Sequence, residues 1–573
     1  MANPPNQVIL AIDIGSSSVR CSAYSRQHND NDDDAVVSRS SMIASTQKQL
    51  RGVEPSTGQI FVSDIQTQVD TCVDDVLNQL QREAFDYDNS SSFEIVSIGV
   101  STFVMNLIGL DYDNNVVTTL SYACNTPSVA AESRALLQHQ SYDDQKKQVD
   151  YEALRQRTGC YSYHSSYALP QLRCYYRDHH TTPSVRRWTT IASLILSSWI
   201  VSDDDDNNNE ACKEEAERML NTISYSEASW TGMLNFRTGT WDEELISQYL
   251  PEDARCHLPT ICKDNVLTMG MASIRKWPQM ARAILLAGVG DGVCANVGSK
   301  CTSSNRIAVT IGTSAASRII LPIEIGDEAF HVPKGLWCYR IDGRRVLLGG
   351  ALTDGGSVVE WARALLNLKE DREFEACLSL IHEQIVSDPY HCNDSGSVTM
   401  VPFLSGERSI GWRDGAKGCV HGLTRDVTSV DFMRSCLEGL MLRLAAVLKI
   451  LVLYASQNGG GDDEDDISIL VSGTALERNE TLRKMLANFC LGSKIVVDTE
   501  GVRESTSRGI ALLATAAQRT DNSSSLQSYF WPNEEKIIFS KEDYTALTAE
   551  TETALKQMEK GQNDLIESVC ELW

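Results

Sequence analysis

The sequence AIDIGSSSVRCSAYS, residues 11–25, decides the fold of this chain. The apolar run 8–14 has the length of a strand and is interrupted only by Asp13, and Gly15 with three serines then forms a tight polar turn. The chain continues in an extended run, which predicts a β-hairpin with an acidic residue at the end of its first strand. Backbone N–H groups in such a turn can bind a phosphate without a lysine. An ordinary Gly/Ser hairpin explains the same residues equally well.

A second hairpin of the same design lies in the other half of the chain, where IAVTIGTSAASRII spans residues 307–320. Two such hairpins are typical of a duplicated α/β fold whose halves bind one nucleotide between them. The length of 573 residues is too great for one core and suits two large domains.

The amino-acid composition of the chain limits the kinds of molecule that the protein is expected to bind. Hydrophobic residues make up 42% of the chain, as in a globular protein, and the net charge of −26 argues against binding to nucleic acid. Three acidic runs, 30–34, 203–210 and 462–466, are best interpreted as solvated insertions because like charges repel and resist burial.

The lack of a recognisable targeting signal and the cysteine usage predict a cytoplasmic protein. The N-terminal residues have no basic stretch followed by an apolar one, and they enter the first strand directly. The apolar run 437–454 contains charged residues, which favours a buried helix over a membrane span. Seventeen cysteines without a CxxC pair are expected to be reduced thiols, mostly buried.

Apolar residues recur with a clear period in several segments. Residues 69–80 repeat apolar side chains at helical spacing and predict a helix against the first sheet, while 430–454 predicts the strongest helix of the chain. Residues 93–101 predict a buried strand. Residues 102–106 follow at its carboxyl end, and such strand ends commonly face a ligand. The small-residue helix expected at 505–517 would allow close approach to a flat ring.

Asp291 follows a short apolar strand and stands between two glycines, in GVGDGVCANVGSKC. Flanking glycines let the backbone come close to a ligand, so the carboxylate is presented at a strand-to-helix turn. An alternative role for this aspartate is to cap the helix that follows it. The segment does not match a P-loop, because serine stands where that motif has lysine.

Two polar candidates have alternative interpretations. Asn125 precedes a helix expected to begin near Pro127 and is explained most simply as its cap. His164 is explained most simply as a satisfied structural histidine. The neighbouring tyrosines of RTGCYSYHSSYALP would nevertheless form a polar aromatic surface suited to a sugar.

Taken together, these motifs resemble the FGGY family of carbohydrate kinases, which belongs to the actin-like, ribonuclease-H-like ATPases. The resemblance covers about residues 8–519 and includes GGALTDGGSVVEW, at the position of the family signature, and SGTALERNETLRKML, which resembles the adenosine motif. It implies two ribonuclease-H-like domains with an active-site cleft between them. The implied units are a sugar-binding domain at 8–301, a nucleotide-binding domain at 302–520 and an extension at 521–573.

The resemblance also implies ATP-dependent phosphorylation of a sugar or sugar acid with Mg²⁺. Asp291 would be the catalytic base, and Asp13 would hold the hydrated metal. The remaining implied contacts are Gly15, Ser16, Ser17, Ser18, Arg20, Gly312, Thr313 and Ser314 for phosphates, Gly473, Ala475 and Asn479 for adenine, and Asn106, Asn125 and His164 for the sugar.

Within the family, STFVMNLIGLD and LSGERSIGWRDGAKG are most similar to the gluconate kinase branch, which implies gluconate as the first substrate. Val104, Met105 and Pro127 replace a tryptophan, a histidine and an arginine usual in that branch, and Thr474 replaces a glycine usual in the family. A pentulose or polyol kinase such as a xylulokinase is therefore the alternative, followed by a non-catalytic nucleotide-binding protein. The expected partners are the sugar and ATP, with no nucleic acid and no membrane, and a homodimer is compatible with the sequence.

Overall fold

The protein is described from a computed structural model. The structure describes residues 6–25, 27–29, 32–36, 42–51, 59–87, 93–103, 107–118, 120–121, 126–138, 150–178, 185–200, 210–263, 266–267, 277–387, 398–458, 467–472, 476, 479–489, 494–498, 504–517, 535–539 and 549–570.

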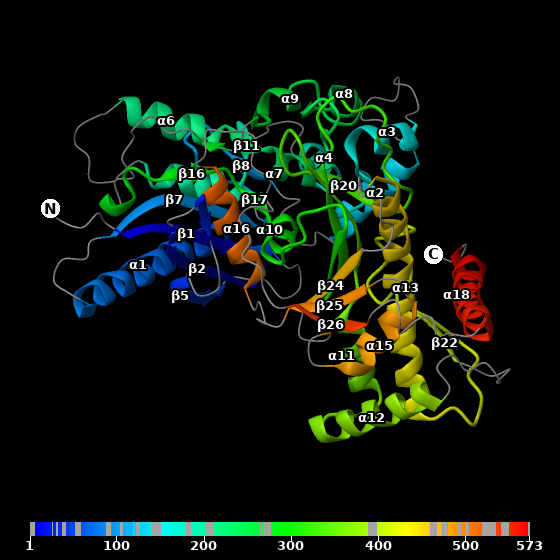
Figure 1. Cartoon of the computed structure of the whole chain (residues 1–573). Helices are drawn as coiled ribbons and strands as arrows, with labels where there is room; N and C mark the ends of the chain where they lie inside the picture. Colours follow the sequence, from blue (N-terminus) through cyan, green and yellow to red (C-terminus); the bar gives the residue numbers. More distant parts are fainter. Residues whose placement is uncertain are drawn as a thin grey trace.

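The opening hairpin forms the centre of a seven-stranded mixed sheet (Figure 1). Its strand order is β15-β16-β7-β1-β2-β5, with β17 also paired to β7. The β1–β2 pair is antiparallel, whereas β7 lies parallel to β1 on its other side. The strands are β1 (Asn6–Ile14), β2 (Ser18–Ser25), β5 (Met42–Gln49), β7 (Phe93–Thr102), β15 (Val266–Leu267), β16 (Ile284–Leu286) and β17 (Val289–Gly290).

The second hairpin forms the centre of another seven-stranded sheet, with the order β20-β21-β19-β18-β24-β25-β26. The β18–β19 pair is antiparallel, and β24 lies parallel to β18, so the arrangement around the first hairpin is repeated. The strands are β18 (Arg306–Ile311), β19 (Ala315–Leu321), β20 (Trp337–Arg340), β21 (Val346–Leu352), β24 (Ser468–Ser472), β25 (Lys494–Asp498) and β26 (Glu535–Phe539). The duplicated α/β fold predicted from the two hairpins is confirmed.

Helices cover both sheets at the predicted places. In α1 (Val62–Tyr87) the repeated apolar side chains between Val69 and Leu80 are buried, and the helix contacts β2 and β5. The longest helix of the second half, α13 (Ser429–Asn458), covers β19 and β21. The other described helices include α2 (Pro127–Leu137), α3 (Tyr151–Thr158), α4 (Ala168–Asp178), α5 (Ile191–Ser198), α6 (Glu210–Leu220), α7 (Tyr225–Trp230), α8 (Glu243–Tyr249), α9 (Ala254–His257), α10 (Asp291–Gly298), α11 (Gly356–Leu365), α12 (Asp371–Ser387), α15 (Glu480–Phe489), α16 (Ser505–Ala516) and α18 (Ala549–Cys570).

The small-residue helix α16 crosses back to the first sheet, where it contacts β1, β7 and α10 (Figure 1). A Cβ on Gly509 would stand 1.8 Å from the carbonyl oxygen of Cys294, and one on Gly298 would stand 1.7 Å from that of Ser505. The small residues therefore permit close contact between two helices, and this packing joins α16 to the first half of the chain.

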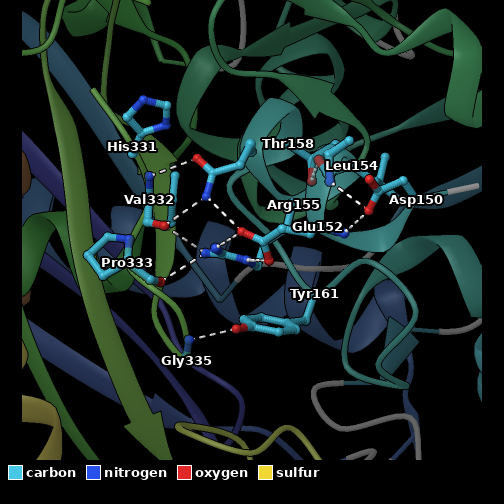
Figure 2. A network of polar contacts seen from close by, with 12 residues as sticks. Asp150, Glu152, Leu154, Arg155, Thr158, Tyr161, His331, Val332, Pro333 and Gly335 are labelled. Atoms are coloured by element: carbon cyan, nitrogen blue, oxygen red, sulfur yellow. Dashed lines mark hydrogen bonds and ion pairs between the residues drawn. The ribbon is translucent and has the colours of Figure 1, made fainter. Parts of the chain in front are cut away.

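A polar network joins α3 of the first half to the strap 331–335 of the second (Figure 2). Arg155 Nη1 donates to the carbonyl oxygens of Val332, at 2.9 Å, and Pro333, at 2.8 Å. Gly335 N donates to the Tyr161 hydroxyl at 2.6 Å. Arg155 is buried, so these bonds are shielded from water and hold the two halves together at this edge.

The C-terminal segment packs on the second half. Strand β26 forms the edge of the second sheet, and α18 lies beside α13 (Figure 1). Gln562 Nε2 donates to the carbonyl oxygens of Met400 and Gly439, and Ile566 is buried against Val401 and Phe403. In the described part of the chain the cysteines shown are free thiols, most of them buried. Among the same residues, no helix has both the length and the apolar character needed to cross a bilayer.

Candidate active site

The strand register brings Asp13 and Asp291 to the same edge of the first sheet. Asp13 lies in β1 opposite Ser101 of β7, and Val289 of β17 pairs with Ser101 from the other side. Asp291 follows two residues later, as the first residue of α10. One strand, β7, therefore lies between the strands that lead to the two residues, and the charge of Asp291 acts on Asp13.

Both carboxyl groups have raised pKa values. Burial raises the pKa of Asp13 to about 7, the charge of Asp291 adds to this effect, and the charge of Arg20 opposes it. Burial also raises the pKa of Asp291, against the charge of Arg318 and a hydrogen bond from Gly292 N to its Oδ1, at 2.6 Å. The N-cap of α10 is Gly290, so Asp291 does not serve as the cap that the sequence left open. A perturbed pair of acids at a strand-to-helix turn is characteristic of a functional site.

The first turn is closed by a bond from Gly15 N to the carbonyl oxygen of Ser18, at 2.9 Å, and Ser17 at its tip is exposed. Arg20 lies opposite Asp13 across β1 and β2, so the two side chains share one face of the sheet. Its guanidinium contacts Gln47 Oε1 at 2.8 Å and Glu504 Oε1 at 3.6 Å. Arg20 is thus held at the first turn, near Asp13.

The second turn is braced by the residues that begin α11. Gly355 N donates to the carbonyl oxygen of Thr313, and Gly356 N donates to that of Gly312, at 2.8 and 2.7 Å. A Cβ on Gly356 would stand 2.7 Å from the Gly312 oxygen, and one on Gly355 would stand 2.6 Å from the Ser314 oxygen. The paired glycines of the GGALTDGGSVVEW motif therefore allow this segment to support the turn 312–314 directly.

His164 is buried, and both of its ring nitrogens contact the protein. Its Nε2 lies 2.7 Å from Asp414 Oδ1, and its Nδ1 accepts from Ser166 N at 3.2 Å. Burial alone would raise the pKa of Asp414, but hydrogen bonds from His164, Ser133 and Ser165 lower it to about 2. The observed contacts of His164 hold the loop 404–416 of the second half, and its contact with a sugar stays a prediction.

The tyrosines near His164 pack mainly on protein. Tyr161 stacks on Trp412 with ring centroids 4.6 Å apart, and Tyr163 meets Tyr161 edge to face. The Tyr167 hydroxyl is 2.7 Å from that of Tyr339, and the ring is buried. These rings form part of the contact between the halves, and their contact with a sugar stays a prediction.

Four sequence candidates, Asn106, Asn125, Gly473 and Ala475, lie outside the described residues, as do Val104, Met105 and Thr474. Of the other candidates, Asn479 accepts from Leu482 N at 3.2 Å, so it caps α15 as its position suggested. Helix α2 begins at Pro127, as expected, but its N-cap is Thr126 rather than Asn125. The cap lies one residue later because the Thr126 hydroxyl accepts from Val129 N.

Three side chains around these turns were not singled out from the sequence. Asp354 accepts from Ser405 N at 2.7 Å and so ties the α11 turn to the loop 404–416. Asp414 accepts hydrogen bonds from donors that lie more than two hundred residues away in the chain. Arg318 of β19 lies near Asp291. Their partners are distant in sequence, so the local signals were the glycine-rich segments that contain Asp354 and Asp414.

Both halves of the chain match models of one protein family. The model of the FGGY family of carbohydrate kinases, N-terminal domain, matches residues 8–298, and that of the C-terminal domain matches residues 307–518. A gluconokinase of Bacillus subtilis (strain 168) is 28% identical over 292 residues, which cover 48% of this chain and 51% of that protein. The chain thus spans about half the length of the curated relatives that it matches.

Solved structures share the fold along nearly the whole chain. A gluconate kinase from Lactobacillus acidophilus superposes with a TM-score of 0.71 at 20% identity, covering 98% of both chains. A ligand-bound xylulose kinase from the same organism gives a TM-score of 0.70 at 20% identity, again covering 98% of both.

Proposed function

Because the chain belongs to the FGGY family of carbohydrate kinases, we propose that it transfers the γ-phosphoryl group of ATP to a hydroxyl of a sugar or sugar acid. Gluconate, converted to 6-phosphogluconate, is the first candidate. The observation that supports this proposal most strongly is the pair Asp13 and Asp291, placed one strand apart beside the first turn, with raised pKa values.

Asp291 is the proposed base. The acceptor hydroxyl oxygen forms a bond to the γ-phosphorus as the bond from that phosphorus to the β–γ bridging oxygen breaks, and the hydroxyl proton passes to the Asp291 carboxylate. Because its pKa is raised, the Asp291 carboxylate holds a proton more strongly than an ordinary aspartate does, which suits a proton acceptor. The Gly292 N–H bond orients one of its oxygens.

Asp13 fits a site for Mg²⁺. Two neighbouring carboxylates that repel each other in a desolvated place are a suitable environment for a divalent cation, and oxygen is the ligand that Mg²⁺ prefers. The described residues contain no group of three or more acidic, histidine or cysteine side chains that could hold a metal. The metal would therefore keep most of its waters, with Asp13 as its protein contact, and would neutralise charge on the phosphates.

The nucleotide would lie between the two halves. Backbone donors of residues 15–18 and 312–314 are the proposed phosphate contacts, and Arg20 adds positive charge beside Asp13. We assign the sugar to residues 8–301 and the nucleotide to residues 302–520, with adenine near Gly473, Ala475 and Asn479. We place the reaction in the cytoplasm, with the sugar and ATP as the molecules that the protein binds.

A pentulose kinase is the second candidate. Val104, Met105 and Pro127 depart from the gluconate kinase branch, and the structure of the ligand-bound xylulose kinase matches this chain about as well as that of the gluconate kinase does. Comparison of kcat/KM for gluconate, xylulose and neutral polyols with purified protein and Mg·ATP decides between the two.

Substitution Asp291→Asn tests the enzymatic proposal. The variant keeps the shape of the side chain but removes its basic oxygen, so it should bind ATP and sugar while kcat falls by about 100- to 10,000-fold. Calorimetric titration with each ligand measures binding separately from turnover. A variant with the wild-type rate would refute the role of Asp291, and a wild-type protein that binds ATP but phosphorylates no sugar would favour a non-catalytic member of the family.

A further inference from the structure

Helix α7 contacts both the strand that leads to Asp291 and the second half of the chain. Its neighbours are β17 on the first side and β20 on the second (Figure 1). All six residues of α7 are buried. A helix this short has little stability of its own, so its place is fixed by the side-chain and backbone contacts that it makes.

The contact nearest to the proposed base is made by Ser226 of α7. Its Oγ accepts a hydrogen bond from Gly290 N at 3.0 Å, and the serine is fully buried. Gly290 is the N-cap of α10, and Asp291 is the first residue of that helix. The bond therefore fixes the backbone immediately before the residue whose carboxylate would take the proton.

The same face of α7 also contacts the residue that follows Asp291. Ser226 and Trp230 lie four positions apart, which places them on one face of the helix. A Cβ on Gly292 would stand 3.3 Å from the ring of Trp230. One face of α7 therefore packs against the backbone on both sides of Asp291.

The first turn of α7 holds the segment that enters β17. Ser224, the N-cap of α7, accepts from Glu227 N at 3.0 Å and donates its hydroxyl proton to the carbonyl oxygen of Gly288. The carboxylate of Glu227 fills the space that a Cβ on Gly288 would need. The start of α7 is thus tied to the chain two residues before the N-cap of α10.

We propose that Ser226 is a positioning residue for Asp291, which keeps the carboxylate directed at the acceptor hydroxyl. The inference rests on the proposed kinase function. One oxygen of Asp291 is itself held by Gly292 N, so the backbone and the side chain of the base both depend on the geometry of residues 290–292. A misplacement of about 1 Å in a reacting group can lower a rate by about 100-fold, so a single bond at this point is sufficient to affect turnover.

The test compares Ser226→Ala with the matched control Ser229→Ala. Ser229 belongs to the same helix, is equally buried and accepts from Arg340 N at 2.8 Å, on the side of the second half. Each substitution leaves one buried N–H without its acceptor, so Tm should fall to a similar extent in both variants. With Mg·ATP and the better phosphorylated of gluconate and xylulose, kcat should fall by about 10- to 100-fold in Ser226→Ala and stay within about threefold of wild type in Ser229→Ala. The KM for ATP should change by less than about threefold in either variant.

A second measurement shows whether Ser226 acts through Asp291. When Asp291→Asn is already present, adding Ser226→Ala should lower the residual rate by less than about threefold, because the group that it positions has lost its function. A further fall as large as that seen in the wild-type background would overturn the proposal. Ser226→Cys, which keeps a weak acceptor, should be intermediate, and it replaces Ser226→Ala in every comparison if the alanine variant does not fold.

An equal fall of kcat in Ser226→Ala and Ser229→Ala would overturn the proposal, because it would reflect a general loosening of α7. An unchanged kcat in Ser226→Ala would overturn it as well, while leaving the kinase proposal intact. If the wild type phosphorylates no sugar, the kinase proposal fails, and amide hydrogen exchange of residues 286–293 still decides whether Ser226 holds this segment. Exchange about tenfold faster in Ser226→Ala than in wild type and Ser229→Ala supports that role, whereas equal exchange overturns it.

Discussion

Replacing Asp13 by asparagine should make the metal-free protein more stable, and by an amount that depends on pH. The pKa of Asp13 is about 7 in the folded protein and 3.8 for an ordinary aspartate. Between these values the unfolded chain has released the proton that the folded protein retains, so stability falls as pH rises through this window. The ionised carboxylate then costs the fold about 4 kcal/mol at pH 8, a cost that Asp13→Asn removes.

The assay is thermal unfolding in the presence of a chelator at several pH values. The gain from Asp13→Asn should grow by about 2 to 3 kcal/mol between pH 5 and pH 8. At pH 8 the full gain corresponds to a rise in Tm of about 3 to 7 °C, the smaller value applying if the whole chain unfolds as a unit. Mg·ATP should then stabilise the wild type more than the variant, because the variant lacks the proposed metal ligand.

The control is Asp253→Asn, which makes the same change of charge at an exposed aspartate without a side-chain capping bond. Its Tm should follow that of the wild type at every pH. An Asp13→Asn variant whose Tm difference is the same at pH 5 and pH 8, or which is less stable at pH 8, would refute the reasoning. That outcome would mean that the Asp13 carboxylate is well solvated and not coupled to Asp291.

Three further predictions concern the surroundings of the site. Gly356→Ala should displace the Gly312 carbonyl and lower kcat/KM for ATP by about 10- to 100-fold, measured by steady-state kinetics, and an unchanged value would contradict the bracing role. Asp414→Asn should weaken the bonds from His164 and lower the free energy of unfolding by about 1 to 3 kcal/mol, measured by denaturant titration; a stability equal to wild type would count against it. Deletion of 549–573 should lower Tm because it uncovers the apolar surface beneath Ile566, and calorimetry showing no change would mean that α18 packs weakly.

The sequence alone determined the architecture because its signals are local. The apolar run before Asp13, the turn at Gly15 and the second copy at 307–320 each follow from strand and turn chemistry within about fifteen residues. The apolar spacing of α1 and α13 is equally local, and both helices form where expected. Asp291 stood out because flanking glycines are visible in the sequence.

Tertiary structure alone decided which side chains meet. Asp13 and Asp291 lie 278 positions apart, and only the pairing of β1 and β17 with the same strand brings their carboxylates into electrostatic contact. In the same way, the His164–Asp414 pair and the place of Arg318 beside Gly292 depend on how the two halves pack. Local residue patterns determine strands, helices and turns, whereas burial, pKa values and contacts between distant residues arise only when the complete chain is folded.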